Sequence, residues 1–214
     1  MPALTTAYLV RHGATSANER QPFVLQGDAI DLPLNENGLR QAQDLGRFFA
    51  SRGLRAAYSS QMLRARQTVE AIAAEAELVP TALPGLQECN VGVWEGLDWD
   101  TIRARHPEAC QAFLTDPAVH PMLGGESYQH VLERVLPVWN ELVARHAGEA
   151  FVLVTHNVVN RVLLASLLGL ELRQGALLRQ RNGCVNLIEI VGDKPHVITV
   201  NSAFHLTDPP SAAW

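Results

Sequence analysis

The chain of 214 residues contains only three cysteines, Cys89, Cys110 and Cys184, and none of them belongs to a Cys-x-x-Cys pair. This odd, widely spaced set argues against a disulfide framework and against a cysteine zinc site. No stretch approaches the roughly 18 consecutive apolar residues of a membrane span, and no basic leader with an apolar run suggests a signal peptide. We therefore expect a soluble, cytoplasmic protein with reduced thiols and no membrane contact.

Charge of one sign is also not in large excess. Apolar residues make up 47% and charged residues 18% of the chain, a balance typical of globular proteins. The formal net charge of -5 argues against nucleic acid as the main partner. It is compatible with an anionic small molecule, because a local pair of arginines outweighs the global sign. No internal repeat, low-complexity tract or polar linker divides the chain.

Short apolar runs rich in β-forming residues alternate with segments of helical periodicity. Strands are predicted at 6–10, 55–59, 151–154, 184–191 and 196–200. Helices are predicted from Asn35 to Gly53, from about Gln61 to Ala76, from Ser127 to Gly148, and through Leu163 to Gly169. Ser16 and Glu19 have the spacing of a capping box, which predicts one further helical turn.

This alternation predicts an α/β protein, a three-layer α/β/α sandwich with a mostly parallel central sheet. The length suits one large domain or two small ones, and the absence of a linker favours a single domain over residues 1–214. Between about 78 and 126 the periodicity weakens and five prolines interrupt the chain. We interpret this region as a small cap-like insertion over a site, not as a separate domain.

Polar residues follow three of the predicted strands at comparable positions. The first strand ends in Arg11 and His12, the second leads to Arg64, and the third ends in His156. If these strands are parallel neighbours, their carboxyl ends project onto one rim of the sheet. Two arginines and two histidines there form a cationic pocket suited to phosphate. Asn18 and the backbone N–H groups of residues 13–18 are expected to add neutral donors. Each residue alone has an ordinary structural explanation; only the combination favours an oxyanion site.

These residues also carry a family resemblance. The segment RHGATSAN resembles the arginine-histidine-glycine signature of the histidine phosphatase superfamily, the phosphoglycerate mutase-like proteins. Six further segments are similar to family motifs in the family's order: QGDAIDLPLNENGLRQA, SSQMLRARQT, LQECNVGVWEG, GGES, VTH and NSAFHL. The resemblance extends from about Tyr8 to Leu206, and it implies the phosphoglycerate mutase-like fold.

The resemblance implies a two-step phosphoryl transfer without metal or cofactor. His12 would attack the substrate phosphorus and form a phosphohistidine, which water then hydrolyses. Arg11, Arg64 and His156 would neutralise charge on the phosphoryl oxygens, with Asn18 as a neutral donor. The expected partner is a small phosphomonoester, and a homodimer is left open.

Further roles follow from the same resemblance. Glu88 matches the family's acid and would protonate the leaving alkoxide. Glu95 is the competing carboxylate, and its Trp-Glu-Gly setting matches a position that we interpret as structural. Gln26, Gly27 and Asn157 fall on the expected substrate-binding side. Asn157 stands where the family usually has glycine, whose backbone N–H approaches the phosphate.

One other departure concerns the substrate. Many members carry arginine two residues before Gln26, whereas this chain has Val24, and Arg20 is a candidate replacement. The residues are compatible with three functions. A phosphatase is favoured over a phosphoglycerate mutase because the 97–125 segment is short, and a non-catalytic phospho-ligand binding module is disfavoured because no expected active-site residue is missing. The cap is expected to set the substrate through Trp99, Phe113, His120 and Met122.

Overall fold

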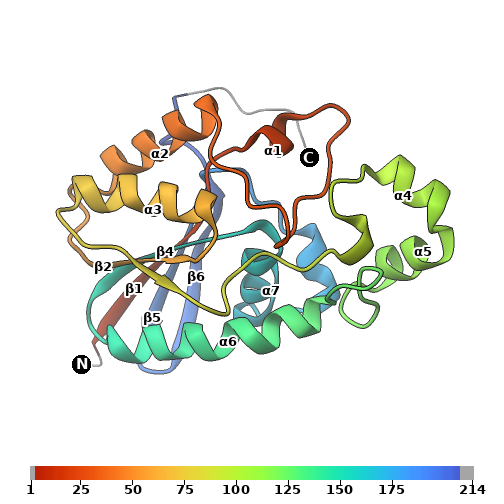
Figure 1. The fold of residues 1–214 in the computed structure, drawn as a ribbon. Helices are drawn as coiled ribbons and strands as arrows, with labels where there is room; N and C mark the ends of the chain where they lie inside the picture. Colours follow the sequence, from red (N-terminus) through yellow and green to blue (C-terminus); the bar gives the residue numbers. More distant parts are fainter. Residues whose placement is uncertain (1–2, 208–214) are drawn as a thin grey trace.

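A computed structural model describes residues 3–207 of the chain, and its centre is a six-stranded sheet (Figure 1). The strands lie in the order β3-β2-β4-β1-β5-β6. β2, β4 and β1 are parallel neighbours, β3 extends them in parallel at one edge, and β5 and β6 pair antiparallel at the other. The strand bounds are Leu4–Arg11 (β1), Leu54–Ser60 (β2), Thr81–Leu83 (β3), Ala150–Thr155 (β4), Val185–Val191 (β5) and Lys194–Ser202 (β6).

Helices cover both faces of this sheet (Figure 1). α2 (Glu36–Phe49) and α3 (Leu63–Glu75) lie on one face, and α6 (Tyr128–Arg145) and α7 (Asn157–Leu167) lie on the other. Successive strand residues point to opposite faces. Leu9 and Leu153 therefore pack with α6 and α7, whereas Val10 and Val154 pack with α2 and α3. The buried strands thus contribute side chains to two hydrophobic layers, one on each face of the sheet. The predicted three-layer α/β/α architecture is confirmed, and its central sheet is mixed.

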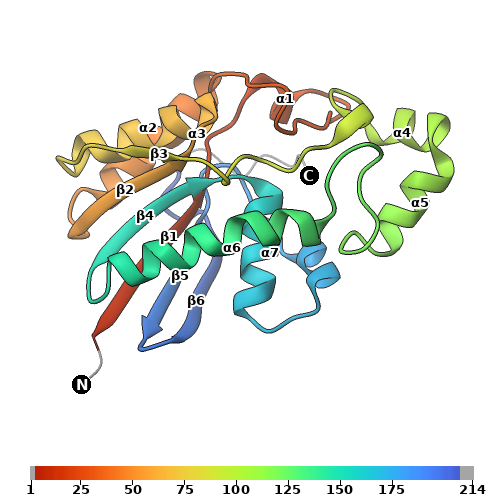
Figure 2. The ribbon, with the colours of Figure 1, turned by 60° about the horizontal axis from the view of Figure 1, so that its bottom comes forward.

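The remaining elements gather beyond the carboxyl ends of β1, β2 and β4 (Figure 2). They are α1 (Ser16–Glu19), η1 (Gly92–Trp94), α4 (Trp99–Arg105), α5 (Pro107–Thr115) and η2 (Leu172–Leu177). The region 78–126, expected as an insertion, also supplies the edge strand β3, which pairs with β2. None of the helices in the described part of the chain has the length and apolar character needed to cross a membrane.

The helix starts test the capping predictions. Asn35 and Ser127 are the N-caps of α2 and α6, as predicted, and the side chain of Asn35 accepts the N–H of Gly38 at 2.8 Å. The prediction for α1 is wrong by one residue, because its N-cap is Thr15 and not Ser16. Glu19 is drawn away from the helix start, since its carboxylate accepts hydrogen bonds from Asn35 and from Asn37.

Candidate active site

The three polar strand ends meet at one rim of the sheet, as predicted. Arg11 is paired with Thr155 in the β1–β4 ladder, and the N–H of His12 donates to the carbonyl of Thr155 at 3.0 Å. Beyond this rim lies a cavity of about 920 Å³. Arg11, His12 and other expected residues line it: Asn18, Gln26, Glu88 and Asn157. Arg64 and His156 lie fully buried behind His12.

His12, the first residue after β1, is 3% exposed and is held at both ring nitrogens. Nδ1 lies 2.7 Å from the carbonyl oxygen of Gly13, which can only accept a hydrogen bond, so Nδ1 carries the proton. Nε2 accepts the Nε–H of Arg64 at 3.2 Å. Both contacts require the same neutral tautomer, in which Nε2 carries a lone pair.

The surroundings of His12 also keep its ring neutral. Burial lowers the pKa of His12 well below its usual 6.5, and the charges of Arg64 and Arg11 lower it further. A neutral imidazole has the lone pair that nucleophilic attack on phosphorus needs. His12 therefore has the protonation state of a nucleophile at neutral pH.

Arg64 is the fixed cation behind this nucleophile. It lies in the first turn of α3, is 0% exposed, and donates from Nη1 to Ile30 O at 3.1 Å and from Nη2 to Gly27 O at 2.9 Å. Asp31 lies 3.6 Å from Nη1. Burial lowers the pKa of Arg64, while Glu88 and Asp31 raise it. With three nitrogens engaged, the guanidinium cannot turn away from His12.

Two further donors surround the same space. Arg11 donates from Nη1 to Gln180 O at 2.5 Å, but its buried Nε has no partner among residues 3–207. His156 contacts Ser60 Oγ through Nε2 at 2.6 Å, and its buried Nδ1 likewise has no partner in that range. The rings of His156 and His12 lie 5.1 Å apart between centroids. Burial lowers the pKa of Arg11 to about 10. Buried nitrogens in this setting are matched by an oxyanion with several acceptor oxygens.

Asn18 is oriented as a neutral donor. Its Oδ1 accepts the backbone N–H of Thr15 at 3.0 Å and the Nδ2–H of Asn182 at 3.2 Å. Its amide oxygen is thus engaged, and its Nδ2 hydrogens are left for a ligand in the cavity. Asn182 also donates to the carbonyl of His12 at 3.1 Å. Asn182 was not predicted from the sequence, because it lies in a loop without periodicity.

Glu88 lies at the start of α7, where it holds the helix terminus. Its carboxylate accepts the N–H of Cys89 at 2.8 Å, of Asn157 at 3.0 Å and of Val158 at 3.2 Å. Such unpaired N–H groups at a helix start attract a carboxylate. The structure therefore differs from the expectation for Asn157: its backbone N–H binds Glu88, and only its other atoms are available to line the cavity.

Gln26 and Gly27 mainly form hydrogen bonds within the protein and offer few free groups to a ligand. Gln26 lines the cavity, but its amide is engaged with Thr15 Oγ1 at 2.8 Å and Ile30 O at 3.2 Å. Gly27 does not line the cavity; its carbonyl holds Arg64, and its N–H donates to Glu95 Oε1 at 2.7 Å. Glu95 is likewise outside the cavity lining, which agrees with the structural role expected for it.

The backbone of the nucleophile loop is bound by side chains that the sequence analysis missed. Gly13 N–H donates to Thr68 Oγ1 at 3.0 Å, and Ala14 N–H donates to Gln41 Oε1 at 2.9 Å. The expectation that these N–H groups serve a ligand is therefore wrong for both residues. A signal was present for Thr68, which follows Arg64 by one helical turn and so lies on the same face of α3.

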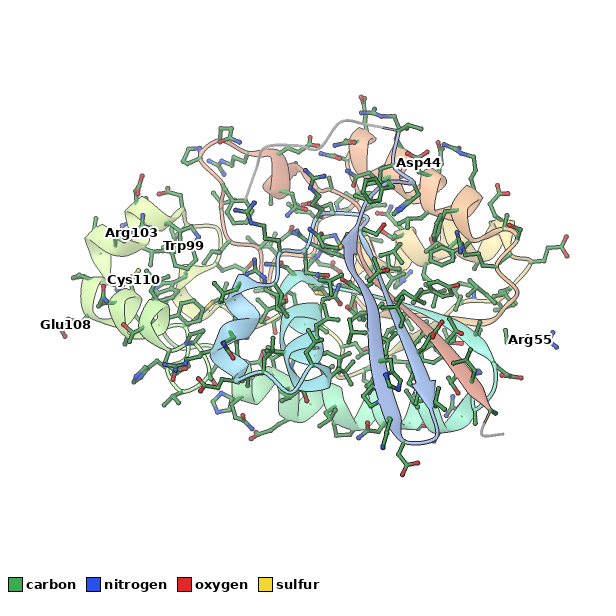
Figure 3. The ribbon with its side chains drawn as sticks, turned by 180° about the vertical axis from the view of Figure 1, so that it is seen from behind. Asp44, Arg55, Trp99, Arg103, Glu108 and Cys110 are labelled. Carbon is green, nitrogen blue, oxygen red and sulfur yellow. The ribbon has the colours of Figure 1, made fainter. Side chains whose placement is uncertain are left out.

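The cap supplies an apolar wall. Trp99, Phe113 and Met122 line the cavity as expected, and the rings of Trp99 and Phe113 stack with centroids 6.3 Å apart. Figure 3 shows Trp99 toward the body of the protein and Glu108 on the outer side of the cap. The expectation for His120 is wrong, because this residue is exposed and lies outside the lining. Arg20 is also absent from the lining and does not replace the family's arginine there.

The acidic and sulfur- or nitrogen-bearing side chains of the chain were also expected to lack a metal site. Within residues 3–207, no group of three or more histidine, cysteine, aspartate or glutamate side chains is arranged to hold a metal ion.

A neutral histidine lies at the end of a parallel strand, with a second histidine, the fully buried Arg64 and the partly buried Arg11 around it. This arrangement is suited to phosphoryl transfer through a histidine. The family model of the histidine phosphatase superfamily (branch 1) matches residues 7–203. The chain belongs to this family.

Several known proteins are similar to the chain. The metal-independent phosphoserine phosphatase of Arabidopsis thaliana is 31% identical over 208 residues, which cover 95% of this chain and 84% of that protein. The structure of Bacillus stearothermophilus YhfR superimposes with a TM-score of 0.86 at 32% identity, over 94% of this chain and 99% of that one. The bifunctional protein Rv2228c of Mycobacterium tuberculosis is 32% identical over 176 residues, 82% of this chain. The chain spans about half (47%) of the length of Rv2228c.

Proposed function

We propose that the chain is a metal-independent phosphomonoester hydrolase that acts on small phosphorylated metabolites through a phosphohistidine on His12. The observation that carries this proposal is the neutral His12 ring, protonated at Nδ1 by its contact with Gly13 and facing Arg64 through Nε2. A relative of similar length is a phosphoserine phosphatase, which supports hydrolysis of a phosphate ester.

In the first step, Nε2 of His12 forms a bond to phosphorus while the ester P–O bond breaks. The electron pair of that bond leaves with the alkoxide, which takes a proton from Glu88. In the second step, water attacks the phosphohistidine, Glu88 accepts its proton, and the P–N bond breaks to restore the lone pair of His12. Arg11 and Arg64 stabilise the charge on the phosphoryl oxygens in both steps.

His156 and Asn18 complete this oxyanion environment. The buried Nδ1 of His156 and the Nδ2 of Asn18 are the donors that we assign to the phosphoryl oxygens. Because these groups are fixed by Ser60 and by Thr15 with Asn182, they need little reorganisation when charge develops. Positioning and electrostatics supply most of the catalysis that phosphoryl transfer requires.

The test is the variant His12→Ala. Its rate of phosphate release from 4-nitrophenyl phosphate should fall by at least about 1,000-fold, because the covalent path is lost. Acid-labile labelling from a radiolabelled phosphate ester should disappear with it. His120→Ala is the matched control, since this histidine is exposed and lies outside the cavity lining. Retained turnover in His12→Ala would refute the assignment of the nucleophile.

The same assay separates a phosphatase from a phosphoglycerate mutase. We expect release of inorganic phosphate to exceed transfer between the two positions of phosphoglycerate. Mutase turnover without appreciable phosphate release would overturn the proposed reaction while leaving His12 as the phosphorylated residue.

Two coarser features complete the proposal. We assign residues 78–126 as a cap within a single domain, supported by the cap residues that line the cavity. We also assign the protein to the cytoplasm, supported by its three buried and unpaired cysteines.

A further inference from the structure

The cavity carries more positive charge than one phosphate needs. Among the described residues, its lining includes four arginines, Arg11, Arg161, Arg179 and Arg181, but only two acidic residues, Glu19 and Glu88. Arg64 adds a fifth cation directly behind it. A phosphomonoester dianion is matched by Arg11 and Arg64, so three arginines stand in addition to the phosphate site. This local excess contrasts with the net charge of -5 for the whole chain.

Arg161 is held in the wall of the cavity. It follows Asn157 by four residues on α7, which places both on one face of the helix, about 6 Å apart along its axis. Its Nε donates to Leu178 O at 3.0 Å. Burial raises the pKa of Tyr128, and the nearby charge of Arg161 lowers it. The same charge also lowers the pKa of Arg11, as expected of a nearby like charge. Arg161 thus extends the cationic surface away from the phosphate site by one helical turn.

The backbone that carries Arg179 and Arg181 is tied to the catalytic residues. Between these two arginines, the carbonyl of Gln180 accepts from Arg11, and the N–H of Arg181 donates to Asn201 Oδ1 at 2.7 Å. At the start of the segment, Leu178 accepts from Arg161. These hydrogen bonds therefore hold the backbone of Arg179 and Arg181 at a defined position beside Arg11.

Apolar side chains form a further part of the lining. Leu25, Val91, Trp99, Phe113 and Met122 contribute to it, and the fully exposed ring of Phe204 also belongs to the lining. The segment that carries Phe204 is anchored to α2, because Asp44 accepts the N–H and hydroxyl of Thr207 at 2.9 Å (Figure 3). A cavity of about 920 Å³ lies in the range of sites for whole cofactors and drug-sized ligands. It is much larger than a phosphate group requires.

From this combination we propose that the substrate is a phosphomonoester with a ring-sized apolar body and a second anionic group. Arg161, Arg179 and Arg181 bind the second anion, and the cap residues contact the apolar body. The inference rests on the proposed function, which assigns the phosphate end of the ligand to His12 and Arg64.

Non-hydrolysable phosphonates test this inference by calorimetry. Phenylphosphonate should bind at least about tenfold more tightly than methylphosphonate, because its ring buries apolar surface that a methyl group lacks. 3-Carboxyphenylphosphonate should bind about tenfold more tightly again, as expected for one charge-assisted hydrogen bond. Benzene-1,3-diphosphonate in the same series distinguishes a subsite that prefers a phosphate from one that prefers a carboxylate.

The arginines are tested through the ratio of the two aryl affinities. In the double variant Arg179→Gln, Arg181→Gln, and in Arg161→Gln, the preference for the carboxylated ligand should fall toward one. Arg161→Lys should keep part of the preference for the carboxylated ligand, because lysine retains the positive charge. Arg173→Gln is the matched control, since Arg173 pairs with Glu171 at 2.7 Å outside the cavity lining.

Each outcome decides between the proposals. Equal affinity for phenylphosphonate and its carboxylated analogue in the wild type overturns the inference. A preference that survives both Arg161→Gln and the double variant also overturns it. The phosphonates are not cleaved, so either result leaves the proposed hydrolysis standing if aryl phosphate turnover still depends on His12. Absence of aryl phosphate turnover in the wild type, or turnover that persists in His12→Ala, refutes the proposed function separately.

Discussion

Helix α2 contacts the nucleophile loop backbone to backbone, and the contact depends on Gly38. A Cβ added at this position would clash with the carbonyl oxygen of Ala14 and lie 2.8 Å from its nitrogen. A Cβ at Gly13 would in turn lie 2.5 Å from the carbonyl oxygen of Gly38. We predict that Gly38→Ala displaces the loop, because neither helix backbone nor loop backbone can rotate out of the way.

The size of the effect follows from these contacts. Alanine stabilises an ordinary helix position by about 1 kcal/mol relative to glycine, whereas overpacking costs about 1–3 kcal/mol, so the free energy of unfolding should fall by about 0–2 kcal/mol. Non-bonded heavy atoms prefer separations of about 3.5 Å. The clash with the carbonyl oxygen of Ala14 is the closest of these contacts, so relieving it requires the two segments to separate by about 1.5 Å. The ring of His12 is bound to Gly13 in this loop. A displacement of that size should lower kcat by about 100-fold.

Gly46→Ala in the same helix is the matched control. Its Cβ would lie 2.8 Å from the carbonyl oxygen of Ala71 on α3, which is also overpacked but lies away from the cavity. This variant should lose stability and keep kcat within about twofold of the wild type. The assay is kcat with 4-nitrophenyl phosphate beside urea denaturation. Wild-type kcat in Gly38→Ala, or equal losses of kcat in both variants, would refute the reasoning.

Two other predictions concern the groups around the nucleophile. Glu95→Ala removes the acceptor of the Gly27 N–H, and the carbonyl of Gly27 binds Arg64, so kcat/KM should fall about 10–100-fold. Glu95→Gln keeps an acceptor oxygen and should lose less of kcat/KM. Equal losses in the two variants would contradict the proposal that Glu95 positions Arg64 through Gly27. Burial holds the pKa of His12 and of His156 well below 6.5, so below about pH 6.5 these two residues together bind two protons in the unfolded chain that they do not bind in the folded one. The free energy of unfolding should then fall by about 2.7 kcal/mol per pH unit as the pH decreases toward the folded pKa values; urea denaturation between pH 7 and pH 5 measures this slope, and a flat profile would contradict it.

The strand ends show what the sequence could predict. Arg11, Arg64 and His156 each follow a short apolar run, and the carboxyl ends of parallel neighbouring strands necessarily lie at one rim. The convergence of these residues therefore depended on strand order. The alternation of elements predicted a mostly parallel sheet, and the prediction of one shared rim was conditional on these strands being neighbours in it. The apolar faces of α2 and α3 were predictable for the same reason, since periodicity encodes them directly.

The side-chain contacts that fix the site could not be predicted in the same way. Thr15 and Ser16 are both good N-caps, and the choice between them was settled by Asn35 and Asn37, which bind Glu19 from another helix start. Asn182 lies 170 residues from His12 in sequence, and such a pairing leaves no local pattern. The strand β3 has three residues, too few for an alternation to be visible.

The hydrogen bonds between Glu88 and the start of α7 determine when the entropic cost of ordering this carboxylate arises. Because three backbone N–H groups hold this carboxylate, the conformational entropy of ordering it is lost once, when the chain folds, and not again at every turnover. An enzyme whose acid arrives on a closing lid must order that acid in each cycle. Here the proposed proton donor is hydrogen-bonded to the start of α7, the helix that also carries Arg161. The groups that contact the two ends of a bound ester are therefore ordered before the ester binds.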